Sequence, residues 1–268
     1  MPRSIPALKL KTNPLVCVLG QVRISPVLQM EEFIPAIQEQ LRRTDYPKFN
    51  REETEELILG PGTQPKVRSS TRWIFLNKEN TAAVVLAQNF IALQVSQYTS
   101  FEIFLGALKA VLEIIGKVAD ISLTERLGLR YVNLIRPKKA SISDYLQPGL
   151  LGLPAGELGI KRLQYRFESA GMTEAGKLVT RLSLSLNGKY LPPDLDGSGL
   201  DYKVTLEKDE PIILLDNDHF SVKQRDYNPA EIIAEMEDLH EYTDRAFRAA
   251  VTEQALSVWG HAPEEVLR

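Results

Sequence analysis

Residues 121–136, ISLTERLGLRYVNLIR, constrain the fold most, because their side chains alternate as in one long, half-buried strand. One face of that strand carries Leu127, Leu129, Tyr131, Asn133 and Ile135. The other face carries Arg126, Gly128, Arg130 and Val132, and Pro137 ends the strand. A strand with one apolar and one basic face is typical of an antiparallel sheet that is covered on one side only.

Helical stripes supply the cover for such a sheet. Apolar residues recur at helical spacing over 30–44 and over 99–116, and Thr99 with Glu102 has the spacing of a capping box. A third helix is predicted after Asn228-Pro229, an N-cap residue followed by a favoured first-turn residue, and extends to about Trp259.

Shorter apolar runs predict the remaining strands. In the first half they cover 15–25, 72–76, 81–87 and 90–96, whereas the polar stretch 45–70 predicts a short helix followed by a loop. In the second half they cover 161–169, 178–186, 202–207 and 211–216. Short connections favour antiparallel pairing. We therefore expect an α+β fold with a curved antiparallel sheet, in two halves, 1–140 and 141–268, or as one continuous domain.

Composition narrows the class of protein. The net charge of −3 gives no overall attraction to nucleic acid, although residues 126–139 hold five bases and no acid, and residues 229–268 hold nine acids and three bases. The single cysteine, Cys17, excludes an intrachain disulfide. The N-terminus lacks the apolar core of a signal peptide, and no apolar run reaches the roughly 18 residues of a membrane span. We expect a cytoplasmic protein with no membrane partner.

Asp216 and Asp218 form the first candidate site. Two residues apart on an extended chain, both carboxylates point to the same side, where they could ligate Mg²⁺ or Mn²⁺. The alternative is a strand end whose carboxylates are solvated or hydrogen-bonded locally. No cofactor is predicted outside the metal hypothesis.

The basic strand face is the second candidate. Arg126 and Arg130 flank Gly128, and two guanidinium groups so placed could clamp a phosphate or a carboxylate. Arg166 and Arg181 extend this surface if their strands pair nearby. The alternative is a solvent-exposed face whose arginines are paired with acidic residues.

The apolar faces carry a few polar groups of interest. Asn133 and Tyr131 fall on the buried side of their strand, where an unpaired amide costs about 1–3 kcal/mol, so we expect Asn133 to be hydrogen-bonded, or to serve as the polar group of a pocket. Glu237, His240 and Asp244 share one helical face. Cys17 lies in an apolar strand and is expected to be an inert thiol. The sequence contains no nucleophile elbow, phosphate-binding loop or dinucleotide fingerprint.

Several segments together resemble a known family. They are RLGLRYVNLIR at 126–136, Tyr98-Thr-Ser-Phe101, Leu-Leu-Asp-Asn-Asp at 214–218, Leu239-His240, Arg245-Ala-Phe247 and Val251-Thr252. They are similar to a sporadically distributed family of uncharacterised bacterial proteins, over nearly the whole chain. The resemblance implies no activity or catalytic residue. The patchy distribution implies an accessory role in a defence or toxin–antitoxin type of system.

Three functions follow as hypotheses. The first is a non-enzymatic binding protein that holds a protein partner or a small anionic ligand on the sheet face, or in the groove between sheet and helices. The second is a metal-dependent enzyme on nucleotides or nucleic acid, with Asp216 and Asp218 as ligands. The third is a nucleic-acid-binding protein that uses the Arg126 and Arg130 face.

Overall fold

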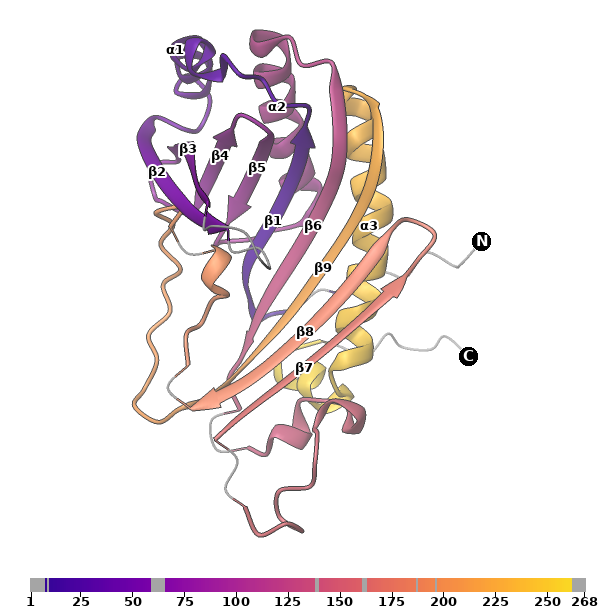
Figure 1. Ribbon diagram of the computed structural model, residues 1–268. Helices are drawn as coiled ribbons and strands as arrows, with labels where there is room; N and C mark the ends of the chain where they lie inside the picture. The colour runs from indigo at the N-terminus through magenta and orange to yellow at the C-terminus, as the bar shows by residue number, and fades with distance from the viewer. Residues whose placement is uncertain are drawn as a thin grey trace.

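The computed structural model describes residues 8, 10–58, 66–137, 140–160, 163–186, 188–195 and 197–261, with the side chains of 54–58 and 66–69 left aside. Within these residues, nine strands form one antiparallel sheet in the order β2-β3-β4-β5-β1-β6-β9-β8-β7 (Figure 1). Helices accompany the sheet in both halves of the chain, so the predicted α+β class with a large antiparallel sheet is confirmed.

The strands join the two halves of the chain, because β6 from the first half pairs with β9 from the second. The strands are β1 (Leu15–Ile24), β2 (Lys48–Ile58), β3 (Lys66–Leu76), β4 (Ala82–Ala87), β5 (Phe90–Val95), β6 (Leu123–Ile135), β7 (Gln164–Met172), β8 (Lys177–Leu186) and β9 (Pro211–Asp226). The α-helices are α1 (Met30–Leu41), α2 (Phe101–Ala119), α3 (Pro229–Ala250) and α4 (Glu253–Val258), and short 3₁₀ turns lie at Ile142–Asp144, Pro148–Leu150 and Pro193–Leu195.

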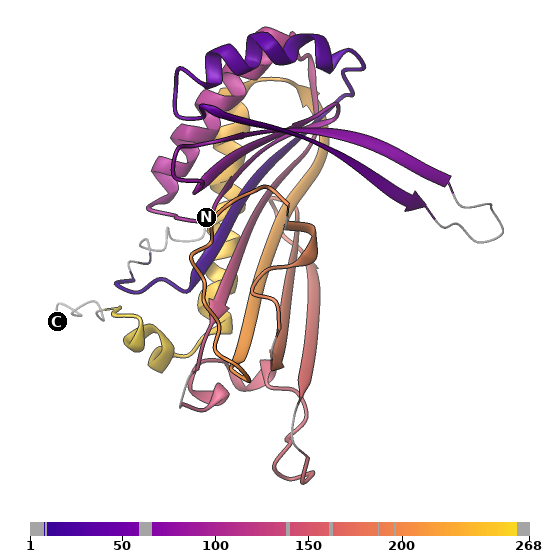
Figure 2. The same cartoon turned by 90° about the vertical axis from the view of Figure 1, so that its left-hand side faces the viewer.

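The helices α1, α2 and α3 lie on one face of the sheet (Figure 2). Their apolar stripes and the apolar faces of β1, β5 and β6 form the main hydrophobic core. Gly20 lets α2 approach the sheet, since a Cβ there would lie 3.0 Å from Leu108 Cδ2 and 3.1 Å from the ring of Phe104. A second core packs β8 and β9 against the C-terminal part of α3 and against α4. We call this side of the sheet the helix face, and the opposite side the open face.

A segment without strand pairing, residues 190–195 and 197–207, crosses part of the open face (Figure 1). Leu191 and Leu195 pack there in a small core with Cys17, Val132 and Leu134. The prediction of a strand at 202–207 is wrong, because these residues pair with none of the described strands. Instead, the Tyr202 hydroxyl lies 2.6 Å from the Gln94 amide, and Lys203 has a left-handed φ of 48°.

The largest correction concerns residues 45–70. They were expected to form a short helix and a loop, but β2 pairs with β3 along its whole length, and the hairpin projects from the sheet (Figure 2). The acidic stretch has no apolar stripe at the spacing of a helix or of a strand. Its conformation is therefore set by pairing with β3 rather than by helix propensity. Residues 59–65, which include Gly60-Pro61-Gly62, lie outside the described residues.

The C-terminal helix is interrupted before Trp259. It was predicted to be continuous, but α3 ends at Ala250, and Val251 is extended, with φ −102° and ψ 158°. Thr252 then caps α4, because its hydroxyl accepts a hydrogen bond from Ala255 N at 3.1 Å. On either side of α4, Val251 and Trp259 both pack in the second core.

Smaller differences concern caps and strand ends. Ser100 rather than Thr99 is the N-cap of α2, because the Ser100 side chain accepts from Ile103 N. β9 continues past Asp216 to Asp226, because β6 offers it partners from Ile213 to Asp226, with one register shift. Among the described residues, no helix is both long and apolar enough to cross a membrane.

Candidate functional site

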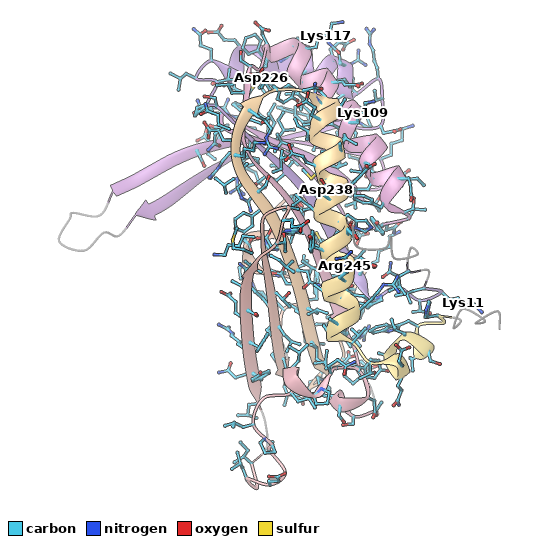
Figure 3. All side chains as sticks on the ribbon, turned by 90° about the vertical axis from the view of Figure 1, so that its right-hand side faces the viewer. Lys11, Lys109, Lys117, Asp226, Asp238 and Arg245 are labelled. Carbon is cyan, nitrogen blue, oxygen red and sulfur yellow. The ribbon has the colours of Figure 1, made fainter. Side chains whose placement is uncertain are left out.

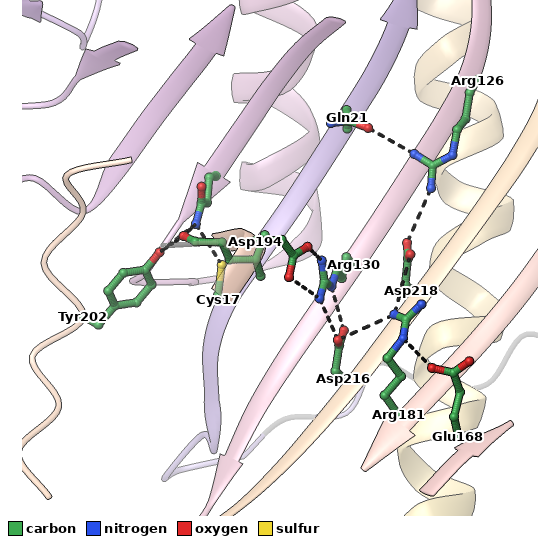
Figure 4. A network of polar contacts seen from close by, with 12 residues as sticks. Cys17, Gln21, Arg126, Arg130, Glu168, Arg181, Asp194, Tyr202, Asp216 and Asp218 are labelled. Atoms are coloured by element: carbon green, nitrogen blue, oxygen red, sulfur yellow. Dashed lines mark hydrogen bonds and ion pairs between the residues drawn. The ribbon is translucent and has the colours of Figure 1, made fainter. Parts of the chain in front are cut away.

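The arginines and aspartates singled out in the sequence meet on the open face of β6, β9 and β8 (Figure 4). Pairing places Arg181 opposite Asp216 and Arg130 opposite Asp218. Asp216 and Asp218 point to the same side, as predicted, whereas His219 lies on the helix face, within 3.0 Å of Leu239 O. We call Arg126, Arg130, Arg181, Asp194, Asp216 and Asp218 the charge network.

Asp216 is the buried centre of the charge network, with 3 % of its surface exposed. Arg130 donates to both of its carboxylate oxygens, at 2.8 Å from Nε and 2.7 Å from Nη2. The same guanidinium pairs with Asp194 on the segment that crosses the sheet. Burial alone would lower the pKa of Arg130, but the hydrogen bonds that it donates to Asp216 and Asp194 raise it above its usual value.

Asp218 is held less tightly. Its nearest cations are Arg126 at 3.8 Å and Arg181 at 3.9 Å, and burial raises the pKa of Asp218 despite them. Arg126 also donates to Gln21 at 3.1 Å and lies 4.2 Å from the centre of the Phe220 ring. Gly128 leaves room for this guanidinium, because a Cβ there would lie 2.8 Å from Arg126 Nη1.

The charge network largely neutralises itself. Arg181 also pairs with Glu168 at 3.0 Å, so each of the three arginines has a carboxylate partner within the described structure. Arg166 lies on β7 outside the charge network, and Asn133 lies on the helix face, where its amide donates to Leu215 O at 3.4 Å. In the described parts of the chain, no three acidic, histidine or cysteine side chains are grouped so that they could hold a metal ion.

A large groove opens on the helix face, between α2 and α3. Its volume is about 1250 Å³. β1 and β6 provide the floor through Leu15, Tyr131 and Asn133, and the two helices provide the walls. Figure 3 shows this side of the molecule, with Lys109 on α2 and Asp238 and Arg245 on α3. We call this site the α2–α3 groove.

Aromatic rings form the base of the groove. The His240 ring stacks on Phe101 with centroids 3.7 Å apart, and its Nδ1 lies 3.0 Å from the Tyr131 hydroxyl. Tyr98 meets Tyr131 edge to face at 6.0 Å. Burial lowers the pKa of His240, although Asp244 opposes the shift, and burial raises the pKa of Tyr131. Both rings are therefore neutral near pH 7.

The rim of the groove is acidic. Among the described residues that line it, Lys109 is the one lysine or arginine, whereas five carboxylates line it, from Glu102, Glu237, Asp238, Glu241 and Asp244. Arg245 and Arg248 pair with Glu241 and Asp244 along α3. Glu237 and Asp238 are exposed to solvent. The local potential therefore favours a cationic ligand.

Sequence reasoning found part of this groove. The shared face of Glu237, His240 and Asp244, and the inward position of Tyr131 and Asn133, were both readable from spacing. The contribution of α2 through Phe101 and Glu102 was missed, because nothing local shows which helices become neighbours. No known protein family matches the chain, and no curated protein matches it in the comparisons.

Proposed function

We propose that this protein is a non-enzymatic binding protein, and that its α2–α3 groove holds a basic, partly apolar segment of a protein partner. The observation that carries the proposal is the combination of an aromatic base and an acidic rim in one large hollow. The groove volume of about 1250 Å³ exceeds the roughly 300–1,000 Å³ of most small-molecule pockets, which favours an extended segment over a small ligand.

Each part of the groove suits one part of such a segment. Aromatic rings at the base bury apolar side chains and attract cations over their faces. The carboxylates of Glu237 and Asp238 stand at the solvent edge, where charges steer a partner and select its register. A two-helix groove is a common place for a peptide to lie.

The site supports binding better than catalysis. His240 lines the base of the groove, and its Nδ1 already contacts the Tyr131 hydroxyl. One face of the His240 ring stacks on Phe101, so the ring acts as part of an aromatic wall.

The open face is the less favoured site. An anion or a nucleic acid would have to displace Asp216 from Arg130, or Glu168 from Arg181. A Mg²⁺ or Mn²⁺ ion at Asp216 and Asp218 would face the guanidinium groups of the charge network. The metal-dependent and nucleic-acid hypotheses, the cytoplasmic location, and the accessory role implied by the family resemblance stay predictions.

The test uses a fluorescein-labelled peptide of alternating lysine and leucine, with a glutamate–leucine peptide as the charge control. Fluorescence anisotropy should show saturable binding of the first peptide alone. Glu237→Lys on the rim should weaken it about tenfold, and Glu79→Lys, in an exposed turn between β3 and β4, should leave it unchanged. Equal loss in both variants, or no binding by the native protein, would contradict the proposal.

A further inference from the structure

Strand β7 ends the sheet, and in the part of the chain that the structure describes no strand pairs with its outer backbone edge. The turn that joins it to β8 has a hydrogen bond from Thr173 N to Gly176 O, and at the other end Leu186 N donates to Leu163 O. Odd-numbered residues of β7 therefore direct their backbone groups towards β8. The alternate residues, such as Arg166, Glu168 and Ala170, direct theirs outward.

Exposed side chains accompany this edge. Leu163, just before β7, and Met172, its last residue, are 64 % and 79 % exposed. Edge strands in soluble proteins are usually short, covered or protected by charge, because a bare edge pairs with other strands. β7 has nine residues, and no other described strand continues the sheet beyond it.

We propose that β7 pairs antiparallel with β7 of a second copy of this chain, across a two-fold axis at Phe167. The charges select this occupant and this register. With Phe167 opposite itself, each Arg166 lies opposite Glu168 of the partner subunit, so the axis creates two ion pairs. An axis at Glu168 or at Arg166 would instead oppose like charges, which is unfavourable.

The same register also accommodates the exposed apolar end of the strand. It places Leu163 opposite Gly171 of the partner subunit, and nothing lies within 4 Å of the position that a Gly171 Cβ would occupy. Arg166 is free to form the new pair, because none of the described carboxylates makes an ion pair with it. Glu168 holds Arg181 through one oxygen and keeps the other available.

Disulfide trapping in the full chain tests the register. Phe167→Cys places two thiols in a non-hydrogen-bonded pair, where the Cβ atoms lie about 4.5–5.5 Å apart. Ala170→Cys is the matched control on the same edge, since its two copies would be six residues, or roughly 20 Å, apart. Cys17 is buried, so the native chain gives no background. Oxidation should yield a cross-linked dimer from Phe167→Cys alone, and equal cross-linking of Ala170→Cys would overturn the register.

Sedimentation measures the unmodified interface and guards against a folding defect in the cysteine variants. The native chain should form dimers whose dissociation constant rises roughly tenfold in Arg166→Glu, which opposes two like-charge pairs. Arg166→Glu combined with Glu168→Arg should recover much of the association. A native chain that stays monomeric at roughly 100 μM, above the range of stable interfaces, would overturn the proposal. So would a dimer that is insensitive to Arg166→Glu.

Discussion

Replacing Arg130 with methionine tests whether the charge network is structural. The Arg130 and Asp216 side chains are 11 % and 5 % exposed, so solvent cannot replace either partner. In Arg130→Met, the nearest cation left to Asp216 is Arg181, whose Nη1 lies 3.7 Å away. Removing one partner of a buried ion pair costs about 3–5 kcal/mol, because the other charge is left uncompensated.

Urea unfolding followed by tryptophan fluorescence is a suitable assay, since Trp73 and Trp259 are both buried in the native structure. With an m-value of about 3 kcal/mol/M, the midpoint of Arg130→Met should fall by roughly 1–2 M. Arg23→Met, an exposed arginine on β1, is the matched control and should change stability by less than about 0.5 kcal/mol.

A double variant separates the loss of the Arg130–Asp216 attraction from the cost of leaving the buried Asp216 carboxylate without its partner. Arg130→Met with Asp216→Leu removes both charges and fills the space with apolar atoms. It should recover most of the lost stability, because a well-packed apolar replacement of a buried pair is often neutral or stabilising. If Arg130→Met costs less than about 1 kcal/mol, or the double variant is less stable than Arg130→Met, the reasoning is refuted.

Three further predictions concern packing, pH and reactivity. Gly20→Ala should destabilise the fold by about 1–3 kcal/mol in the same urea assay, because its Cβ meets Leu108 at 3.0 Å; an unchanged midpoint would contradict this. Burial lowers the pKa of His219 and His240, so the unfolded chain binds more protons. The free energy of unfolding should therefore fall as the pH drops through about 6.5, and His240→Gln should reduce the slope; an unaltered slope in that variant would argue against the assignment. Burial raises the pKa of Cys17 to about 12, so a thiol reagent at pH 8 should label the unfolded chain but not the native one.

Periodicity made most of the fold predictable from the sequence. Leu127, Leu129 and Tyr131 pack into the main core as their alternation requires, and the stripe of α2 does so as well. Predictions from local sequence pattern were wrong where contacts with distant segments set the conformation. Residues 48–58 become a strand because β3 pairs with them, and α3 ends at Ala250 because the second core draws Val251 inward.

The candidate site was predictable only in part, for a related reason. The shared face of Arg126 and Arg130 follows from alternation, but their neutralisation depends on Asp194 and on the register of β9, which are long-range features. The α2–α3 groove needs two helices that are far apart in sequence to become neighbours. The spacing of residues within one helix does not show which other helix packs beside it.

The ring signal of His240 in an NMR titration tests the proposed function most directly. His240 lies at the base of the α2–α3 groove, whereas His219 is fully buried under α3 and contacts Thr173. Adding the lysine–leucine peptide should shift the His240 signal, assigned with His240→Gln, and leave the His219 signal in place. Saturable binding with an unmoved His240 signal would contradict the account.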